Sequence, residues 1–318
     1  MSNPTQLFDI SQRVRGELYK FLLSPSYQDA IVSQEFQDAY LDTVKRQLTP
    51  DEKKPLLIDP PHEIKVGASF YGQAKKCPRK AWYKIRNFDK GVLTPNAKLK
   101  FMYGDSIEFL VILIAKHTNL CIENTQAQVS KTYDTQGGKF TVRGMMDCTV
   151  DGNVFDVKSA STYAFKKFKD LQDSGNESQF INNDAFAYVD QLDVYSGILH
   201  ADNAIHPQGW IAVEKQLGHI ATPVIESEAA WDRHVPLVDA QMRAPLPPER
   251  NAGTDHHLPV ADGKSGNMKL PISCSYCDYK RNCWQDANGG RGIRTFLYSN
   301  KPVDLVVVSR EPKVKELL

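Results

Sequence analysis

Residues 144–158 read GMMDCTVDGNVFDVK, and this stretch predicts the centre of the fold. Asp151-Gly152-Asn153 has the composition of a tight hairpin turn, so the residues on either side form two adjacent strands. Side chains at i and i+2 of a strand share a face, and Asp156 and Lys158 therefore project together. Because the turn is short, Asp147 on the first strand can approach Asp156 across the hairpin. The stretch thus predicts two carboxylates and a lysine in one place.

The chemistry of these three side chains points to a hard divalent cation. Two carboxylates are the ligands with which Mg²⁺ or Mn²⁺ holds a phosphate and a water. A neighbouring lysine can orient the water and stabilise charge that develops on the phosphate. The acid-x-Lys pattern also occurs elsewhere, for example at Asp51 and Glu63, but only the copy at Asp156 has apolar strand residues around it. A solvated strand pair without function is the alternative interpretation.

Helices are predicted on both sides of these strands. Residues 96–118 form the first, and Glu108 on it can supply a third carboxylate. Residues 182–200 form the second, which is amphipathic and carries Gln191 and Tyr195. These two residues are four positions apart, so they lie on one face, one turn from each other. A plain amphipathic helix explains Tyr195, but less readily a polar glutamine on the same face.

The rest of the chain indicates a mixed α/β organisation. Two helices are predicted over residues 5–48, because apolar residues recur there at spacings of three or four. Strands are predicted at residues 120–132, 139–158, 210–215 and 303–308, with a turn at 136–138 and an exposed loop at 245–268. We therefore expect three parts: a helical N-terminal arm and linker at residues 1–62, a main domain at 63–290 and a C-terminal tail at 291–318.

The most specific local signal is Cys274-x2-Cys277-x5-Cys283. Two residues between thiolates let one turn of chain present both sulfurs to a single metal centre. These three cysteines are one ligand fewer than such a centre needs. Cys77, which lies in a basic segment, is the expected fourth ligand. Zinc and an iron–sulfur cluster both accept four thiolates, so ligand type does not separate them. Such a centre would join segments about 200 residues apart, and its binding energy would be folding energy. The alternative is that all six cysteines are unligated.

Composition limits the classes that remain. The chain has 318 residues, of which 41% are hydrophobic and 24% charged, which is typical of globular proteins. A net charge of +1 gives no global field for a polyanion, so a nucleic-acid site must be a local patch. We expect no membrane helix and no secretory signal. Six cysteines are too few for a disulfide scaffold and indicate a reducing compartment. Cys121 and Cys148 lie in predicted strands and are expected to be buried thiols.

Residues 71–86 form a basic segment with six cationic and no acidic residues. Trp82 and Tyr83 are interleaved with the cations. Cations near phosphates and aromatic rings that stack on bases are the two components of a single-strand binding groove. The candidate DNA-binding residues are Lys76, Arg79, Lys80, Trp82, Tyr83, Lys84 and Arg86. The alternative is a solvated helix face with two core aromatics.

Taken in their order along the chain, these features resemble the PD-(D/E)XK nuclease superfamily and, within it, the RecB-like branch. They are most similar to the iron–sulfur subset that includes the AddB nuclease domain and the CRISPR-associated RecB-like exonucleases. That subset has one Cys before the core and a Cys-x2-Cys-x5-Cys after it, and the resemblance spans roughly residues 70–285. It implies a restriction-endonuclease-like core, in which helices flank a mixed central sheet, with a helical N-terminal extension and an iron–sulfur-stapled C-terminal segment.

The resemblance also implies roles for individual residues. Asp147 and Asp156, with Glu108, would bind Mg²⁺ or Mn²⁺, and Lys158 would be the catalytic lysine. Gln191 and Tyr195 would position the DNA backbone. The four cysteines would bind a [4Fe-4S] cluster, with zinc as the alternative; they are Cys77, Cys274, Cys277 and Cys283. The RecB-like branch usually has a His at the position of Glu108, and a Glu there is similar to viral exonucleases of the lambda type.

These expectations describe a metal-dependent DNA exonuclease of recombination, repair or replication. It would act in the cytoplasm of a bacterial or phage-infected cell, on DNA with a single-stranded end and without a membrane. A recombination or replication protein is the expected partner. The alternative is a non-catalytic, metal-stapled DNA-binding module within a larger recombination complex. The acidic pair argues against that alternative, because two close carboxylates repel each other when no cation is present.

Overall fold

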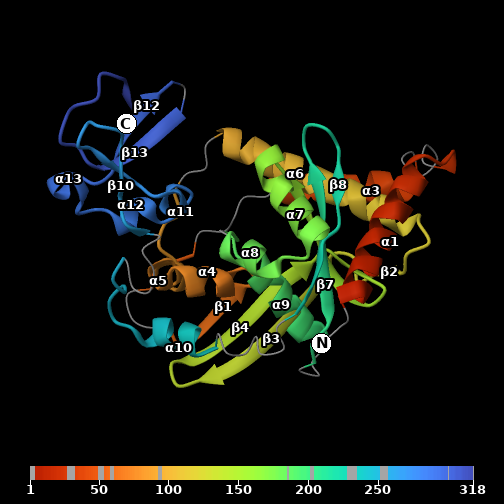
Figure 1. The fold of residues 1–318 in the computed structure, drawn as a ribbon. Helices are drawn as coiled ribbons and strands as arrows, with labels where there is room; N and C mark the ends of the chain where they lie inside the picture. The colour runs from red at the N-terminus through yellow and green to blue at the C-terminus, as the bar shows by residue number, and fades with distance from the viewer. Residues whose placement is uncertain are drawn as a thin grey trace.

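The structure is a computed structural model that describes residues 4–26, 33–48, 54–57, 61–91, 95–184, 186–200, 204–227, 235–250, 257–299 and 301–317. Over these residues the protein is mixed α/β, and its strands form three sheets (Figure 1). The predicted α/β class is therefore confirmed. The expected single central sheet is instead divided in two, with the break at Asp147.

The first sheet has three strands in the order β1 (Glu63–Gly67), β4 (Gly138–Met146) and β3 (Ala127–Thr135). β1 runs parallel to β4, and β3 runs antiparallel to it. The β3–β4 turn lies at residues 136–137, as the glycines predict. Asp239 supports this turn, because its carboxylate accepts a 2.6 Å hydrogen bond from the Gly137 amide.

The second sheet contains the predicted hairpin. Its strands are β2 (Ile122–Glu123), β5 (Cys148–Val150), β6 (Asn153–Ala160), β7 (Pro207–Glu214) and β8 (Ile220–Ala221), with β9 (Val224–Glu226) also paired to β7. β5 and β6 are antiparallel, and Asp151 and Gly152 between them both have positive φ (51° and 80°). These values suit the two-residue turn that the sequence predicts. β6 continues the sheet by pairing in parallel with β7.

Helices cover both faces of this sheet. On one face α1 (Pro4–Leu22) and α6 (Pro95–Lys116) pack against Phe155 and Val157 of β6, and α3 (Gln34–Leu48) lies against α6. On the other face Val154 and Ala160 contact α7 (Thr162–Ser174), α8 (Glu177–Asn182) and α9 (Tyr188–Leu199). Alternate residues of β6 thus face two separate cores. The predicted apolar face of α1 is confirmed. This helix lies within the predicted N-terminal arm, but its apolar face packs into the core of the second sheet. The sequence analysis did not identify α7.

The C-terminal part forms a third, five-stranded sheet. Its order is β10 (Val260–Ala261), β11 (Met268–Lys269), β13 (Lys301–Val307), β12 (Arg294–Tyr298) and β14 (Glu316–Leu317). The short helices α11 (Ile272–Ser275), α12 (Lys280–Cys283) and α13 (Ala287–Gly290) connect β11 to β12. The predicted boundary after residue 290 therefore falls between two strands of one sheet. The expected late strand at 303–308 is confirmed as β13.

The helix formed by residues 78–85 links this part to the rest of the protein, because its Tyr83 packs on Tyr279. α4 (Phe70–Lys76) packs on α9, and α5 (Pro78–Ile85) packs on α10 (Val235–Arg243). In Figure 1 the C-terminal sheet and α11–α13, drawn in blue, lie next to α5. Among the described helices, none is both long and apolar enough to cross a membrane.

Candidate active site and cysteine pocket

β6 presents Asp156 and Lys158 together on one face. The Lys158 Nζ lies 2.5 Å from Asp156 Oδ2, so the predicted shared face is confirmed. Asp156 is only 3% exposed, whereas the Lys158 side chain keeps 22% of its surface accessible. Both residues lie on the α7–α9 side of the strand, because their even-numbered neighbours Val154 and Ala160 pack there. The Asp156 carboxylate is therefore more deeply buried than the Lys158 side chain.

Asp147 lies in the link between β4 and β5, where the chain passes from the first sheet to the second. Its Oδ2 accepts a 2.7 Å hydrogen bond from the backbone N–H of Val157, the residue between Asp156 and Lys158. Asp147 is 8% exposed. The hairpin thus brings the three predicted residues to one buried point, as the short turn required.

Glu108 approaches the same point from α6. Its Oε1 accepts a 2.6 Å hydrogen bond from the side chain of Gln126. The backbone N–H of Gln126 donates in turn to the carbonyl of Asp147 at 3.0 Å. Gln126 adopts a positive φ of 53°, which is uncommon for a residue other than glycine. The sequence analysis missed this residue, because nothing in the composition of residues 124–126 marks it as a bridge.

The three carboxylates leave this site with an excess of negative charge. Burial raises the pKa of Asp147 well above its usual value, and the charges of Asp156 and Glu108 raise it further. Burial also raises the pKa of Glu108, with Asp156 adding to the effect. For Lys158 burial acts to lower the pKa, but Asp156 and Asp147 outweigh it and the pKa is raised. One lysine therefore faces three acids, and a divalent cation would offset the remainder.

Tyr195 and Gln191 lie beside this cluster on α9. The Tyr195 hydroxyl donates a 2.9 Å hydrogen bond to the carbonyl of Met145, and Gln191 Nε2 lies 3.5 Å from the same hydroxyl. Gly144 makes room for the ring, since a Cβ there would lie 2.6 Å from Tyr195 Cε1. Burial raises the pKa of Tyr195 to about 12. The ring of Tyr188, which the sequence analysis did not single out, lies 5.2 Å from Lys158 Nζ.

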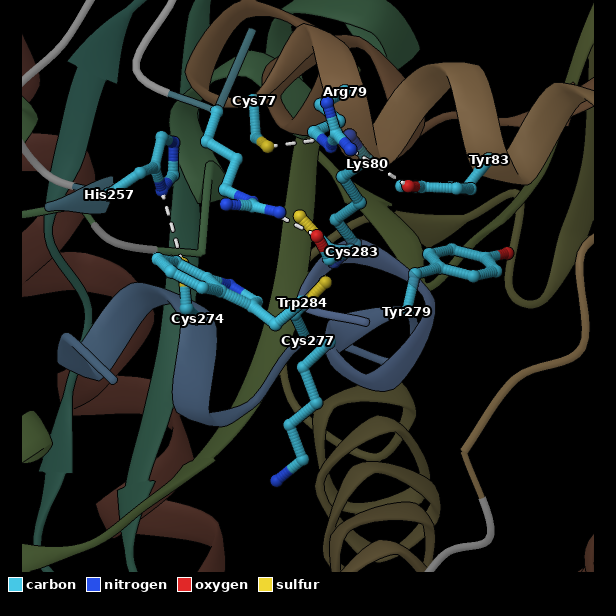
Figure 2. A pocket seen from close by; sticks show the side chains of 12 residues that line it. Cys77, Arg79, Lys80, Tyr83, His257, Cys274, Cys277, Tyr279, Cys283 and Trp284 are labelled. Atoms are coloured by element: carbon cyan, nitrogen blue, oxygen red, sulfur yellow. Dashed lines mark hydrogen bonds between the residues drawn. The ribbon is translucent and has the colours of Figure 1, made fainter. Parts of the chain in front are cut away.

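The four predicted cysteine ligands line one pocket. Cys77 caps the N-terminus of α5, where its sulfur accepts a 3.4 Å hydrogen bond from the Lys80 amide. Cys274, Cys277 and Cys283 approach from α11 and α12 on the other side (Figure 2). The structure thus brings together segments that the spacing alone could only suggest. Outside the pocket Cys148 is buried, as expected, but Cys121 is exposed because it precedes the edge strand β2.

Cations surround these thiols and suit them to a metal centre. Burial raises the pKa of Cys77 and Cys283, and raises that of Cys277 to about 12, whereas Arg79 and Arg250 act to lower the pKa of Cys283. A thiolate formed here would be close to guanidinium groups that offset its charge. Four thiols in one pocket with neighbouring cations fit a four-thiolate metal centre.

The basic segment around α5 is placed differently from the DNA-binding groove that was expected. Trp82, Tyr83 and Arg86 are buried. The Trp82 indole donates to the Ala244 carbonyl at 2.9 Å, the Arg86 guanidinium lies 4.3 Å from the Trp82 ring centroid, and Tyr83 stacks on Tyr279. These three residues hold α5 against α10 and α12, so they are not accessible for base stacking. The remaining predicted DNA-binding residues are half-buried: Lys76, Arg79, Lys80 and Lys84.

Neither site is preassembled around an ion. In the part of the chain that the structure describes, no three carboxylate, thiol or imidazole side chains converge tightly enough to surround one. The donor types nevertheless fit their proposed partners, with oxygen ligands at the acidic site and sulfur ligands in the pocket.

Comparison with known proteins gives little further guidance. No family model matches the chain, and no curated protein does. One solved structure, titled "Crystal structure of SSO0001", is similar at 13% sequence identity over 78% of this chain and 95% of that chain, with a TM-score of 0.39. Similarity at this level carries no argument about the site.

Proposed function

We propose that the protein is a divalent-metal-dependent DNA nuclease with exonuclease activity. Its catalytic site would consist of Glu108, Asp147, Asp156 and Lys158. The hydrogen bond from the Val157 amide to the Asp147 carboxylate carries the proposal, because it ties both strands of the hairpin into one acidic cluster. Buried acids that raise one another's pKa are unfavourable for folding alone, and such groups concentrate at functional sites.

The residues would divide the work as follows. Glu108, Asp147 and Asp156 would hold Mg²⁺ or Mn²⁺, which supplies a Lewis acid that offsets phosphate charge and promotes ionisation of water. Lys158 keeps its proton, since its pKa is raised, and its ammonium group can donate a hydrogen bond to a phosphate oxygen. Hydrolysis adds one water across one bond: the water oxygen bonds to phosphorus, the P–O bond to the leaving group breaks, and a proton passes to the departing oxygen. Tyr195 and Gln191 would fix the position of the backbone.

DNA would reach this site along the N-terminal half of α6, the helix that carries Glu108. Large apolar side chains are exposed there, including Phe101 (58%) and Tyr103 (51%). Lys98 and Lys100 on the same helix are exposed, and Lys215 Nζ lies 5.9 Å from the Tyr103 ring centroid. Exposed rings beside cations suit stacking on the bases of a single strand whose phosphates are neutralised. This surface takes the role first expected of α5.

The cysteine pocket would hold a [4Fe-4S] cluster, with zinc as the alternative. Either would join α5 to α11 and α12 and so hold the C-terminal part against the nuclease core. Its binding energy would then contribute to folding.

The proposal is tested with anaerobically purified protein and DNA labelled at each end in turn, single- or double-stranded, with Mg²⁺, Mn²⁺ or chelator. We expect metal-dependent degradation that Lys158→Ala reduces by at least about 10²-fold without weakening DNA binding. Lys139→Ala is the matched control, because Lys139 is exposed on β4 away from the cluster. The double variant Phe101→Ala/Tyr103→Ala should bind single-stranded DNA more weakly. Undiminished cleavage by Lys158→Ala would remove the assignment, and binding without cleavage under any metal would favour the non-catalytic module.

A further inference from the structure

The cysteine pocket contains a histidine that the cysteine spacing does not reveal. His257 is 7% exposed and lines the pocket together with the four cysteines (Figure 2). Its Nε2 lies 2.8 Å from the backbone carbonyl of Lys76, the residue immediately before Cys77. A carbonyl oxygen only accepts hydrogen bonds, so Nε2 must carry the hydrogen. The imidazole is therefore tied to the end of α4, next to Cys77, and has a defined orientation.

The other ring nitrogen points at a predicted metal ligand. His257 Nδ1 lies 3.5 Å from the sulfur of Cys274. With Nε2 protonated, a neutral imidazole presents a lone pair at Nδ1. Histidines that bind metals usually donate their second N–H to a carboxylate, a backbone carbonyl or water, which fixes the ring for coordination. The contact between Nε2 and the Lys76 carbonyl has this form.

The separation of the two atoms also suits a shared ion. A sulfur about 2.3 Å and a nitrogen about 2.0–2.1 Å from one tetrahedral metal are about 3.5 Å apart. The Nδ1–Sγ separation of 3.5 Å agrees with this value. In the absence of metal a proton lies between the two atoms, and a metal ion can take its place. His257 and Cys274 thus form a ready pair of ligands at one corner of the pocket.

We propose that His257 is a ligand of the metal centre through Nδ1 and shares one metal ion with Cys274. The inference rests on the proposed metal centre in its zinc form, because each iron of a [4Fe-4S] cluster binds three sulfides and one protein ligand and has no position for both Cys274 and His257. The pocket then offers one neutral imidazole in addition to four thiols, so the centre has mixed nitrogen and sulfur coordination.

The test uses the full-length protein, purified anaerobically, with its metal identified by elemental analysis. X-ray absorption at the edge of that metal should show nitrogen as well as sulfur in the first coordination shell. His257→Ala should lose the nitrogen contribution and bind the metal at least about tenfold more weakly in competition with a chelator. His257→Cys should retain the metal with an all-sulfur shell. His219→Ala is the matched control, because His219 is exposed and lies outside the pocket.

Each other outcome is decisive. An all-sulfur shell in the wild type overturns the inference even if the variants fail to fold, and it leaves the proposed nuclease standing. Protein that folds and cleaves DNA without bound metal in the pocket overturns both the centre and its histidine ligand. Nitrogen coordination in a protein that never cleaves DNA supports the inference and removes the nuclease assignment.

Discussion

The acidic site and the cysteine pocket are built from chain segments in opposite ways. Apart from Glu108, the acidic residues come from one hairpin, and the backbone N–H of Val157, next to Asp156, donates a hydrogen bond to the Asp147 carboxylate ten residues earlier. The cysteine pocket joins α5 to α12. A hydrogen bond from the Tyr83 hydroxyl to the Asn282 carbonyl also joins these helices, and the two residues are 199 positions apart in the sequence. A site built from one hairpin depends on strand register. A site built from segments about 200 residues apart depends on the packing of the complete fold. The comparison therefore predicts that the pocket contributes to stability and that the acidic site opposes it.

The largest effect is expected at the pocket. Cys77→Ser should lose most of the bound metal and lower the free energy of unfolding by about 3–5 kcal/mol, because it releases a link that closes a loop of about 200 residues. Denaturant unfolding and metal analysis of the same samples measure both. Cys121→Ser is the control, since Cys121 is exposed outside the pocket, and its change should stay within about 0.5 kcal/mol. Equal stability of the two variants would contradict the claim that the cysteine pocket contributes to stability.

The acidic site should respond in the opposite direction. Asp147→Asn keeps an oxygen that can accept the hydrogen bond from the Val157 amide. It removes a carboxyl group whose pKa is raised in the folded protein. Cleavage should fall by at least about 10²-fold. A raised pKa in the folded state means that the ionised form costs stability above the usual range for Asp, so the variant should be at least as stable as the wild type at pH 8 in chelator. Thermal unfolding in chelator measures this, and a clear loss of stability would show that the cluster is structural.

A smaller change should sharpen the picture of the acidic site. Gly144→Ala places a methyl group 2.6 Å from Tyr195 Cε1 and should displace the ring. We expect about a tenfold loss of cleavage and a loss of about 1–3 kcal/mol in stability. Tyr195→Phe keeps the ring but removes its hydrogen bond to Met145, and the double variant shows whether the two effects are coupled. Unchanged cleavage in Gly144→Ala would mean that Tyr195 has no part in positioning the DNA.

The parts of the fold that follow from local rules were predictable from the sequence. The turn at Asp151 and Gly152, the common face of Asp156 and Lys158, and the apolar face of α1 each follow from backbone geometry or a short period. The spacing of three cysteines also indicated a common pocket. These features need no knowledge of how distant segments pack.

The features that were missed depend on tertiary contacts. Burial of Trp82 and Arg86 results from α10 packing on α5, and a basic segment with aromatics looks the same whether its rings face solvent or core. His257 lies in a stretch rich in proline, glycine and aspartate, where a histidine carries no periodic signal. Gln126 is held by the Glu108 side chain, 18 residues earlier in the sequence, and by the backbone carbonyl of Asp147. In each case the decisive partner is far away in sequence.

The packing of α1 has a consequence for how the protein is made. Thr222 donates a hydrogen bond to the Ser11 carbonyl, and the two residues are 211 positions apart. Because α1 precedes β7 to β9 in the sequence, part of its apolar face stays uncovered until those strands have been made, and Cys77 meets the cysteines of α11 and α12 later still. Long-range closure of this kind slows folding and leaves apolar surface open to association.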